Sequence, residues 1–293
     1  MRVAVTGGTG FVGMHTVRAL AKAGHDVVAI ARGTRARLLP KSVKFVRADV
    51  TDSANLAESF AGCDAVINLV AIIREHGSAT FDLVNRVGTE HVAEAARTAG
   101  VPHLIHQSAN GADPNPAFPY LQTKWAGEEA VVGSGVPFTV LRPSLIFGPG
   151  DGFFTLLARV IRLTPVTVIA GDGSTLFQPI SIDDVAQCVL VALQRGPSHR
   201  VHTIGGPEHL SYNDIVGIIK AAIGAHRFTV HAPVPAMVPL AFLMQTVLPN
   251  PPLTLDQLRM LPVNNITRLD SVSAAFGFEP ESFGDNADYL QDY

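Results

Sequence analysis

The sequence has few cysteines: only Cys63 and Cys188 occur among its 293 residues. This scarcity excludes a disulfide-rich scaffold, and the two thiols lack any spacing typical of a metal site. Each lies in an apolar or loop-bounded context. We therefore expect two buried free thiols, which are typical of a protein from a reducing compartment, and no bound metal.

Charged residues are also scarce, at 16% of the chain, and they sum to a formal net charge of −3 at pH 7. Nucleic-acid binding requires a concentrated basic surface, so this balance argues against a nucleic-acid partner. The cluster of Arg32, Arg35, Arg37 and Lys41 is local. A small anionic ligand explains so short a cluster better than a polymer does.

A long apolar leader is absent as well. Arg2 is followed at once by a short apolar run and a glycine turn, which is unlike a signal peptide. This start predicts a cytoplasmic protein, and peripheral attachment to the inner membrane is the alternative location.

The range 232–248 contains no charged residue. It is short for a membrane span and includes Pro233, Pro235 and Pro239, so we predict no transmembrane helix there. Two interpretations stay open. The segment is either a helix packed on the sheet or a surface that contacts a membrane, a quinone or a partner subunit.

The most informative feature that is present follows the first apolar run. Residues 6–13 read T-G-G-T-G-F-V-G, which spaces Gly7, Gly10 and Gly13 as G-x-x-G-x-x-G. In a dinucleotide site the first glycine permits a tight turn, the second lets backbone N–H groups approach a diphosphate, and the third lets the next helix pack closely. The diphosphate then lies at the helix N-terminus, beside Phe11 and Val12. A plain turn without a ligand is the alternative interpretation.

The end of the second predicted strand bears on the choice of dinucleotide. NAD sites usually carry a carboxylate there that accepts hydrogen bonds from the adenosine ribose. The run from Val27 to Arg35 offers none, whereas Arg32 and Arg35 can pair with a 2′-phosphate through charge-assisted hydrogen bonds. We therefore predict NADP(H) as the preferred cofactor and NAD(H) as the alternative. Solvated loop charges without a ligand are the other interpretation of these arginines.

Tyr120 and Lys124 form a Y-x-x-x-K pair inside a stretch of helical composition. Residues four apart share one helix face, so their side chains lie about one turn apart. A neighbouring ammonium lowers the pKa of a phenol, which predicts Tyr120 as a general acid or base and Lys124 as its activator. Such pairs also occur on exposed helix faces, but the glycine motif in the same chain favours the catalytic interpretation.

With both motifs in place, the chain resembles a short-chain dehydrogenase/reductase of the extended or atypical type, in the NAD-dependent epimerase/dehydratase superfamily. It is most similar to the branch that contains the NADPH-binding accessory subunit of respiratory complex I and its bacterial relatives. The similarity runs through nearly the whole chain. The further segments that carry it are Asn68-Leu69-Val70-Ala71, Asn85-x-x-Gly88-Thr89, residues 103–108, 141–149 and 177–185, Gly205-Gly206-Pro207-Glu208, and residues 252–257.

The resemblance implies roles for further side chains near the reaction. Ser108 corresponds to the residue that hydrogen-bonds the substrate oxygen, and Lys124 to the residue that also binds the nicotinamide ribose. Asn85 matches an asparagine that holds a structural water or forms part of a proton path; a plain polar residue of the helix is the alternative. Ser108 precedes Tyr120 by only twelve residues. This loop is short for the family, and it leaves the size of the substrate pocket open.

The same resemblance implies the remaining cofactor contacts. Asp49 and Val50 follow the third predicted strand and match the adenine-binding position, although Asp49 also suits a helix cap. The range Leu69–Ala71, with Val70 at its centre, ends the fourth strand and matches the segment along the nicotinamide ribose. Pro143 matches the segment on the nicotinamide side.

Strand-like runs alternate with helical stretches through the first half of the chain, which predicts an α/β fold with a Rossmann-type, doubly wound parallel sheet. We expect strands near 2–6, 26–31, 43–47, 64–69, 102–107 and 137–142, and helices near 11–23, 53–60, 78–99 and 120–133. After Pro149 the pattern breaks into shorter pieces. The predicted nucleotide-binding domain is therefore 1–147 with 178–200, and 148–177 with 201–293 form a smaller C-terminal substrate lobe.

These features favour an NADP(H)-binding oxidoreductase that reduces a carbonyl or quinone-type small molecule. The first alternative is a non-catalytic NADPH-binding accessory or assembly protein of a respiratory or quinone-related complex, and the uncharged range 232–248 supports it. The second is a nucleotide-sugar epimerase or dehydratase. Such relatives usually hold NAD tightly, which the Arg32 region disfavours.

Overall fold

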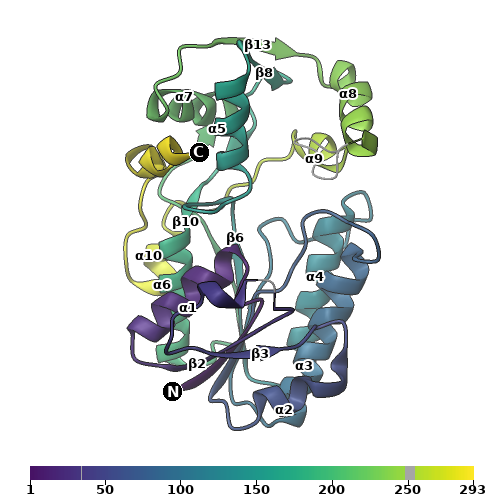
Figure 1. Cartoon of the computed structure of the whole chain (residues 1–293), viewed down its shortest axis with the longest axis vertical. Helices are drawn as coiled ribbons and strands as arrows, with labels where there is room; N and C mark the ends of the chain where they lie inside the picture. The colour runs from purple at the N-terminus through teal and green to yellow at the C-terminus, as the bar shows by residue number, and fades with distance from the viewer. Residues whose placement is uncertain (34, 248–254) are drawn as a thin grey trace. The chain divides into compact units, whose positions relative to one another are not determined.

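Seven parallel strands form one sheet, in the order β11-β6-β5-β4-β1-β2-β3 (Figure 1). Valine, alanine and isoleucine dominate the central strands because helices cover both faces of the sheet. The strands are β1 (Arg2–Thr6), β2 (Asp26–Ala31), β3 (Lys44–Arg47), β4 (Ala65–Asn68), β5 (Leu104–Gln107), β6 (Phe138–Pro143) and β11 (Val201–Ile204).

Two layers of helices cover this sheet. In one layer α1 contacts α6 and α6 contacts α10; in the other α2 contacts α3 and α3 contacts α4. The first layer is α1 (Phe11–Lys22), α6 (Ile182–Arg195) and α10 (Ser271–Phe276). The second is α2 (Leu56–Phe60), α3 (Gly88–Thr98) and α4 (Pro119–Gly133), with the short helices η1 (Ala36–Leu38), η2 (Ser53–Asn55) and η3 (Asp82–Val87) between strands and helices. This architecture confirms the predicted Rossmann-type α/β fold.

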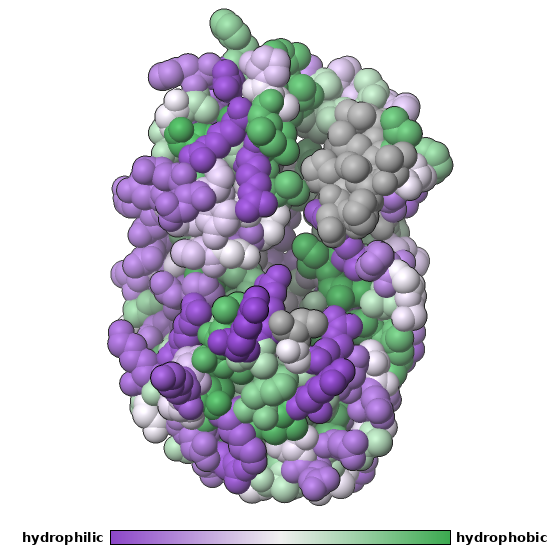
Figure 2. Space-filling model, viewed as in Figure 1, coloured by the Kyte–Doolittle hydropathy of each residue, from purple (hydrophilic) through white to green (hydrophobic). Residues whose placement is uncertain are grey.

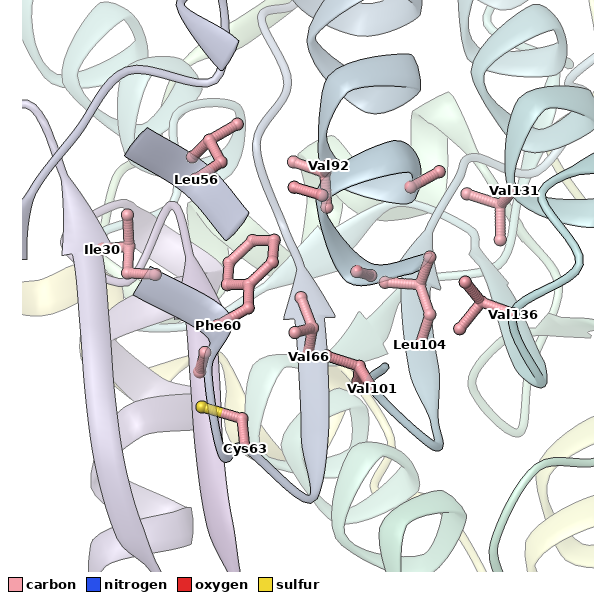
Figure 3. Packing of buried hydrophobic residues seen from close by; sticks show 14 of the residues in the cluster. Ile30, Leu56, Phe60, Cys63, Val66, Val92, Val101, Leu104, Val131 and Val136 are labelled. Atoms are coloured by element: carbon pink, nitrogen blue, oxygen red, sulfur yellow. The ribbon is translucent and has the colours of Figure 1, made fainter. Parts of the chain in front are cut away.

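Aliphatic side chains around Phe60 fill the core between the sheet and the second helix layer (Figure 3). Val66 and Leu104 come from the sheet and are fully buried. Cys63 packs in this cluster, Cys188 is buried in α6, and both are free thiols, as expected. Burial raises the pKa of each thiol, which disfavours the reactive thiolate.

The structure, a computed structural model, describes residues 1–33, 35–247 and 255–293. The chain divides into two units. Unit 1 contains the seven-stranded sheet and consists of Met1–Pro143, Ile182–Ile204 and Ser271–Phe278. Unit 2 consists of Ser144–Ser181, Gly205–Asp270 and Glu279–Tyr293.

Two segments that the sequence assigned to the smaller lobe lie in unit 1. β11 extends the sheet because Val201–Ile204 pairs in parallel with β6, and α10 packs on α6 and β11. Conversely, β7 (Ile146–Phe147) and β10 (Ile180–Ser181) pair with each other in unit 2. Pairing between strands far apart in the sequence sets these boundaries, and local sequence patterns do not reveal it.

Unit 2 has its own aromatic core. Phe147, Phe154 and Phe283 are fully or almost fully buried, and their ring centroids lie 4.5 to 6.2 Å apart. Edge-to-face and tilted pairs of this kind stabilise a core beyond simple burial of area. The further elements of unit 2 are α5 (Phe154–Leu163), β8 (Val166–Ala170), β9 (Leu176–Phe177), β12 (Leu210–Ser211), α7 (Tyr212–Ala222), β13 (Phe228–Ala232), α8 (Val234–Val247), α9 (Leu255–Met260) and η4 (Gly284–Asp292).

Helix α8 accounts for most of the uncharged range. Ala241 is fully buried and packs with Ala170 of β8 and Leu258 of α9, whereas Phe242 and Leu243 are exposed. One side of α8 is therefore core and the other is open to solvent.

No helix within the described ranges is long and apolar enough to cross a membrane. Three predicted features fall partly on residues outside those ranges. They are Thr34 in the arginine loop, Leu248 at the end of the uncharged range, and residues 252–254 in the last family-like segment.

Candidate active site

The glycine turn after β1 has the geometry that its sequence predicts. Gly7 adopts a φ of +73°, a conformation that L side chains rarely adopt, and its N–H donates to the carbonyl of Ile30 at 2.9 Å. A Cβ on Gly13 would lie 2.1 Å from the carbonyl oxygen of Gly7. Only glycine at position 13 therefore lets α1 begin so close to the end of the strand.

The first turn of α1 leaves its backbone N–H groups available for an anion. Gly10 is the N-cap residue, it provides no side-chain cap, and no acidic residue lies in the first turn. The N–H groups of Phe11, Val12 and Gly13 have no partner within the helix. Unpaired donors at the positive end of a helix dipole suit a diphosphate, so these residues fit a dinucleotide.

Three arginines lie at the ends of β2 and β3. Arg32 and Arg35 are exposed, as their predicted role requires. Arg47, which the sequence analysis did not single out, ends β3 in register with Ala31. Its Cδ lies 3.8 Å from the position of a Cβ on Gly33. Strand pairing brings this third cation to the arginine loop. The local sequence Arg47-Ala48-Asp49 does not indicate that Arg47 lies there.

The predicted adenine-binding pair is held by local hydrogen bonds. The Asp49 carboxylate accepts from the backbone N–H of Thr51 at 3.0 Å and from its hydroxyl at 2.9 Å. Val50 is buried, and its Cγ2 would lie 2.8 Å from a Cβ on Gly88 of α3. Asp52, not Asp49, caps the next helical turn by accepting from the N–H of Ala54.

The chain leaving β4 runs directly over the glycine turn. The carbonyl carbon of Leu69 and the backbone nitrogen of Val70 each lie 3.2 Å from the position of a Cβ on Gly7. Ala71 follows and is exposed. The structure therefore brings the predicted phosphate and ribose segments together at one edge of the sheet.

Asn85 holds this crossing segment in place. It is fully buried in the π-helical turn η3. Its side-chain oxygen accepts from the N–H of Ile72 at 2.9 Å, and its amide donates to the Ile72 carbonyl at 3.1 Å and toward the Thr123 hydroxyl at 3.4 Å. Asn85 ties the loop after β4 to α4, the helix that carries Tyr120 and Lys124.

A buried polar row lies across the ends of β1, β4 and β5, and the sequence analysis missed it. The Thr6 hydroxyl donates to the side-chain oxygen of Asn68 at 2.7 Å, and the Asn68 amide donates to Nδ1 of His106 at 3.2 Å. Burial, with the charge of Lys124 as a smaller contribution, lowers the pKa of His106 well below its ordinary value. His106 is therefore a neutral member of a structural network.

His103 lies three residues before His106, directly before the start of β5. Its Nε2 is 3.0 Å from the Thr139 hydroxyl, and burial lowers its pKa to about 4. His103 is therefore a buried histidine with a hydrogen-bond partner in the neighbouring strand. No group of His, Cys, Asp or Glu side chains within the described ranges has the arrangement of a metal site.

Lys124 is a buried cation on α4. Its ammonium donates to the carbonyl of Gln107 at the end of β5, at 2.7 Å. Burial lowers its pKa to about 8, and the nearby Glu128 carboxylate opposes that shift. Glu128 is itself clamped by Arg142 through two hydrogen bonds of 2.7 and 2.8 Å. At neutral pH the lysine is therefore mainly charged and fixed at the sheet edge.

Tyr120 lies in the first turn of α4, with its ring edge-on to Phe81 at a centroid distance of 5.9 Å. Burial raises its pKa to about 12. The Y-x-x-x-K spacing predicts that Lys124 lowers this pKa, and that prediction is wrong for the protein without its ligands. Desolvation of the phenolate outweighs any attraction to the ammonium, which donates to Gln107 instead. Tyr120 is therefore a protonated phenol at neutral pH.

Ser108 follows β5 and is buried, but its hydroxyl has no hydrogen-bond partner among the described residues. Its backbone N–H donates to the Leu141 carbonyl at 2.7 Å, which fixes the residue beside β6. Pro143 is buried at the end of β6, and its carbonyl accepts from the N–H of Asn110 at 2.9 Å. A buried hydroxyl without a partner at a sheet edge is well suited to receive a polar ligand atom.

Comparison with known proteins identifies the family. A model of the NAD dependent epimerase/dehydratase family matches residues 3–205. The chain belongs to this family. The predicted resemblance to extended short-chain dehydrogenases/reductases is thereby confirmed, and so is a nicotinamide dinucleotide as cofactor class, with NADP(H) and NAD(H) both compatible with the family.

Two relatives illustrate the range of proteins to which this chain is similar. The chain is 30% identical to a 2-alkyl-3-oxoalkanoate reductase from Stenotrophomonas maltophilia (strain K279a) over 255 residues, which cover 78% of this chain and 77% of the relative. It is 27% identical to the mitochondrial NADH dehydrogenase (ubiquinone) 1 alpha subcomplex subunit 9 of Arabidopsis thaliana over 282 residues. These cover 89% of this chain and 70% of the relative.

Among solved structures, the fold matches a UDP-glucose 4-epimerase of Thermus thermophilus crystallised with NAD. The TM-score is 0.78 at 22% identity, and the match covers 100% of this chain and 98% of that one. At this identity the likeness establishes the fold alone.

Proposed function

We propose that this family member is an NADP(H)-dependent reductase of a carbonyl or quinone-type substrate, with Tyr120 as the proton donor. The observation that carries the proposal is the buried Ser108 hydroxyl, which has no hydrogen-bond partner among the described residues. Tyr120, whose pKa burial raises to about 12, is a protonated phenol at neutral pH, as a free tyrosine is, and can give its proton to the oxygen that Ser108 holds.

Bound NADPH supplies the hydride for such a reduction. The chain's own residues manage the proton and the geometry. Tyr120 donates the phenolic proton to the substrate oxygen as that oxygen gains negative charge. The Ser108 hydroxyl donates a hydrogen bond to the same oxygen, and the Lys124 ammonium stabilises the phenolate that remains. Solvent then returns a proton to Tyr120.

The preference for NADP(H) rests on Arg32, Arg35 and Arg47. A 2′-phosphate carries negative charge that guanidinium groups bind through paired hydrogen bonds. No carboxylate follows β2 before Arg35 to compete for the ribose hydroxyls. The arginine cluster therefore favours the phosphorylated dinucleotide.

A single-turnover reaction tests the proposal. Protein loaded with NADPH is mixed with a panel of quinones, aldehydes and ketones, and the nicotinamide absorbance is followed. Tyr120→Phe should slow the reaction by at least about 100-fold without changing NADPH affinity. Tyr212→Phe is the matched control, because burial also raises the pKa of Tyr212 to about 12 while Tyr212 lies in unit 2. Equal rates in wild type and Tyr120→Phe would contradict the mechanism.

A second candidate is a non-catalytic NADPH-binding accessory protein at the cytoplasmic side of the inner membrane or in a respiratory complex. The exposed Phe242 and Leu243 on the uncharged helix α8 favour it. Copurification with a membrane complex, lost in a Phe242→Asp and Leu243→Asp double variant, would support this role. NADPH that stays bound and inert across the whole panel would favour it over the reductase.

A further inference from the structure

The buried polar row of Thr6, Asn68 and His106 ends at an atom without a partner. Nε2 of His106 and the hydroxyl of Ser108 have no hydrogen-bond partner among the described residues, although His106 is only 0% and Ser108 only 3% exposed. Both lie beneath the mixed hydrophilic and hydrophobic surface of unit 1 that Figure 2 shows. Buried polar atoms almost always have partners, so these two indicate a place for a polar atom from outside the chain.

The hydrogen bonds of Asn68 fix which end of its amide faces His106. Its side-chain oxygen accepts from the backbone N–H of Val70 at 3.4 Å, and a backbone N–H can only donate. Its nitrogen lies 3.4 Å from the Thr89 hydroxyl, whose own hydrogen goes to the Asn85 carbonyl at 2.8 Å. The amide nitrogen is therefore the group that faces Nδ1 of His106, and Nδ1 must accept from it.

This contact decides the tautomer of His106. Burial lowers the pKa of the ring well below its ordinary value, so the ring is neutral and carries a single hydrogen. Because Nδ1 is an acceptor, that hydrogen lies on Nε2. His106 therefore presents a fully buried N–H donor for which the described residues supply no acceptor. Leaving such a donor unpaired is costly, so an acceptor at this place stabilises the protein.

Ser108 lies on the same face of the sheet as His106. Its backbone N–H donates to the carbonyl of Leu141 at 2.7 Å, which extends the pairing of β5 with β6 by one residue. Side chains two residues apart on a strand point to the same face. His106 is the inner residue of the two, and Ser108 is nearer the edge where β5 ends. A ligand at this edge of the sheet therefore reaches Ser108 first.

One water can join these two side chains. Residues two apart on a strand are separated by about 6.6 Å, and Nε2 of His106 does not bond directly to Oγ of Ser108. A water that accepts from the Nε2–H and donates to Oγ bridges such a gap and gives both atoms a partner. It also gives the water the two polar partners that a buried water needs at least.

We propose that His106 is a positioning residue for the Ser108 hydroxyl and acts through one buried water. Because Oγ of Ser108 accepts from this water, the hydroxyl hydrogen is directed away from His106 and toward the substrate oxygen. The hydrogen bonds then run in one direction, from the Thr6 hydroxyl to the Asn68 oxygen, from the Asn68 amide to His106, and on to Ser108. The inference rests on the proposed function, since it concerns the hydroxyl that holds the substrate oxygen.

Two variants separate positioning from a merely structural role. Asparagine at position 106 keeps an acceptor near the place of Nδ1 and loses the donor at Nε2, whereas glutamine keeps a donor there and loses the Nδ1 acceptor. With the panel of quinones, aldehydes and ketones, His106→Asn should lower kcat by about tenfold, and His106→Gln should stay within about threefold of wild type. A structural role predicts the opposite order. NADPH affinity should be unchanged in both, and His103→Gln is the control, because His103 is also buried but has a partner.

Nitrogen NMR of the full chain with isotope-labelled histidine tests the link without any substrate. The His106 ring should carry its hydrogen on Nε2, and Ser108→Ala should shift the Nε2 signal while the His103 signals stay in place. A hydrogen on Nδ1, or an Nε2 signal that Ser108→Ala does not move, would overturn the proposal. So would wild-type turnover in His106→Asn, or a lower kcat in His106→Gln than in His106→Asn. If wild type reduces no member of the panel, the proposed function fails, and the NMR result still decides whether His106 and Ser108 are linked.

Discussion

The sheet of unit 1 and the β8–β13 ribbon of unit 2 use the same kinds of residue with opposite results. Val3, Ala4 and Val5 of β1 are fully buried because strands flank β1 on both sides and helices cover the sheet. Phe228 and Val230 of β13 have a similar apolar character, yet their side of the ribbon is open to solvent. The difference shows that coverage by other elements, and not strand composition, decides whether an apolar residue is buried in a core or exposed to solvent.

The glycines of the two units offer the largest test of this contrast. A Cβ on Gly13 in α1 would lie 2.1 Å from a backbone oxygen, whereas a Cβ on Gly217 in α7 would meet no atom of the described residues within 4 Å. Gly13→Ala should displace α1 and weaken NADPH binding by about 100-fold or more, which corresponds to about 2.8 kcal/mol. Gly217→Ala should change stability by less than about 1 kcal/mol and leave NADPH affinity unchanged. Isothermal titration measures the affinities, and denaturant unfolding measures the stabilities. Full NADPH affinity in Gly13→Ala would show that the glycine turn does not hold the diphosphate.

A pair of phenylalanines tests the contrast directly. Phe60 in the unit 1 core is fully buried, and Phe228 is 83% exposed. Phe60→Ala leaves a cavity and should lower the free energy of unfolding by about 3–5 kcal/mol. Phe228→Ala should change it by less than about 0.5 kcal/mol. Denaturant unfolding compares the two variants, and a large loss for Phe228→Ala would mean that the ribbon face is covered within the chain.

The two ends of β3 test the choice of cofactor. Arg47 is the last residue of β3 and lies beside the arginine loop, whereas Lys44 is the first residue of the same strand. Arg47→Gln should weaken NADPH binding by about tenfold, because one charge-assisted contact to the 2′-phosphate is lost. NADH affinity should stay the same. Lys44→Gln should alter neither, and an equal loss for both dinucleotides in Arg47→Gln would place the arginine away from the 2′-phosphate.

Acid stability gives a further test of the comparison between the two units. His103 in unit 1 has a pKa of about 4 in the folded protein because of burial, against an ordinary value of 6.5. Between these values the unfolded chain binds a proton that the folded one does not, so the free energy of unfolding falls as pH drops from about 6.5 to 4. His103 should account for up to about 3 kcal/mol of this loss. His103→Gln should flatten the dependence, while substitution of the exposed His231 in unit 2 should not; identical pH profiles for wild type and His103→Gln would contradict the assignment.

Local sequence patterns predicted much of unit 1 and less of unit 2. The strands β1 to β6 and the helices α1, α2 and α4 lie within a few residues of their predicted ranges, because the periodicity of apolar residues sets both. The helix predicted near 78–99 is instead the π-helical turn η3 followed by α3. The glycine turn was predictable for a similar reason, since each glycine meets a local steric need. β11 and α10 were not, because each is placed by contacts with segments distant in the sequence.

The candidate site divides in the same way. Tyr120, Lys124 and Ser108 were found from their spacing and from family resemblance, and their roles stay predictions. Arg47 and the row of Thr6, Asn68 and His106 were missed, since strand register alone brings them to the sheet edge. The raised pKa of Tyr120 was also missed, because desolvation depends on how closely the surrounding atoms pack.

The sequence by itself determined the fold class and the glycine turn, and it predicted the place of the dinucleotide, because these depend on residue type and short-range spacing. Tertiary structure alone decided three further features: the third arginine beside the cofactor loop, the raised pKa of Tyr120, and the exposure of the apolar residues of β13. Each of them depends on which side chains are covered by segments distant in the sequence and which stay exposed to solvent. That information resides in strand pairing and burial, which no local pattern encodes.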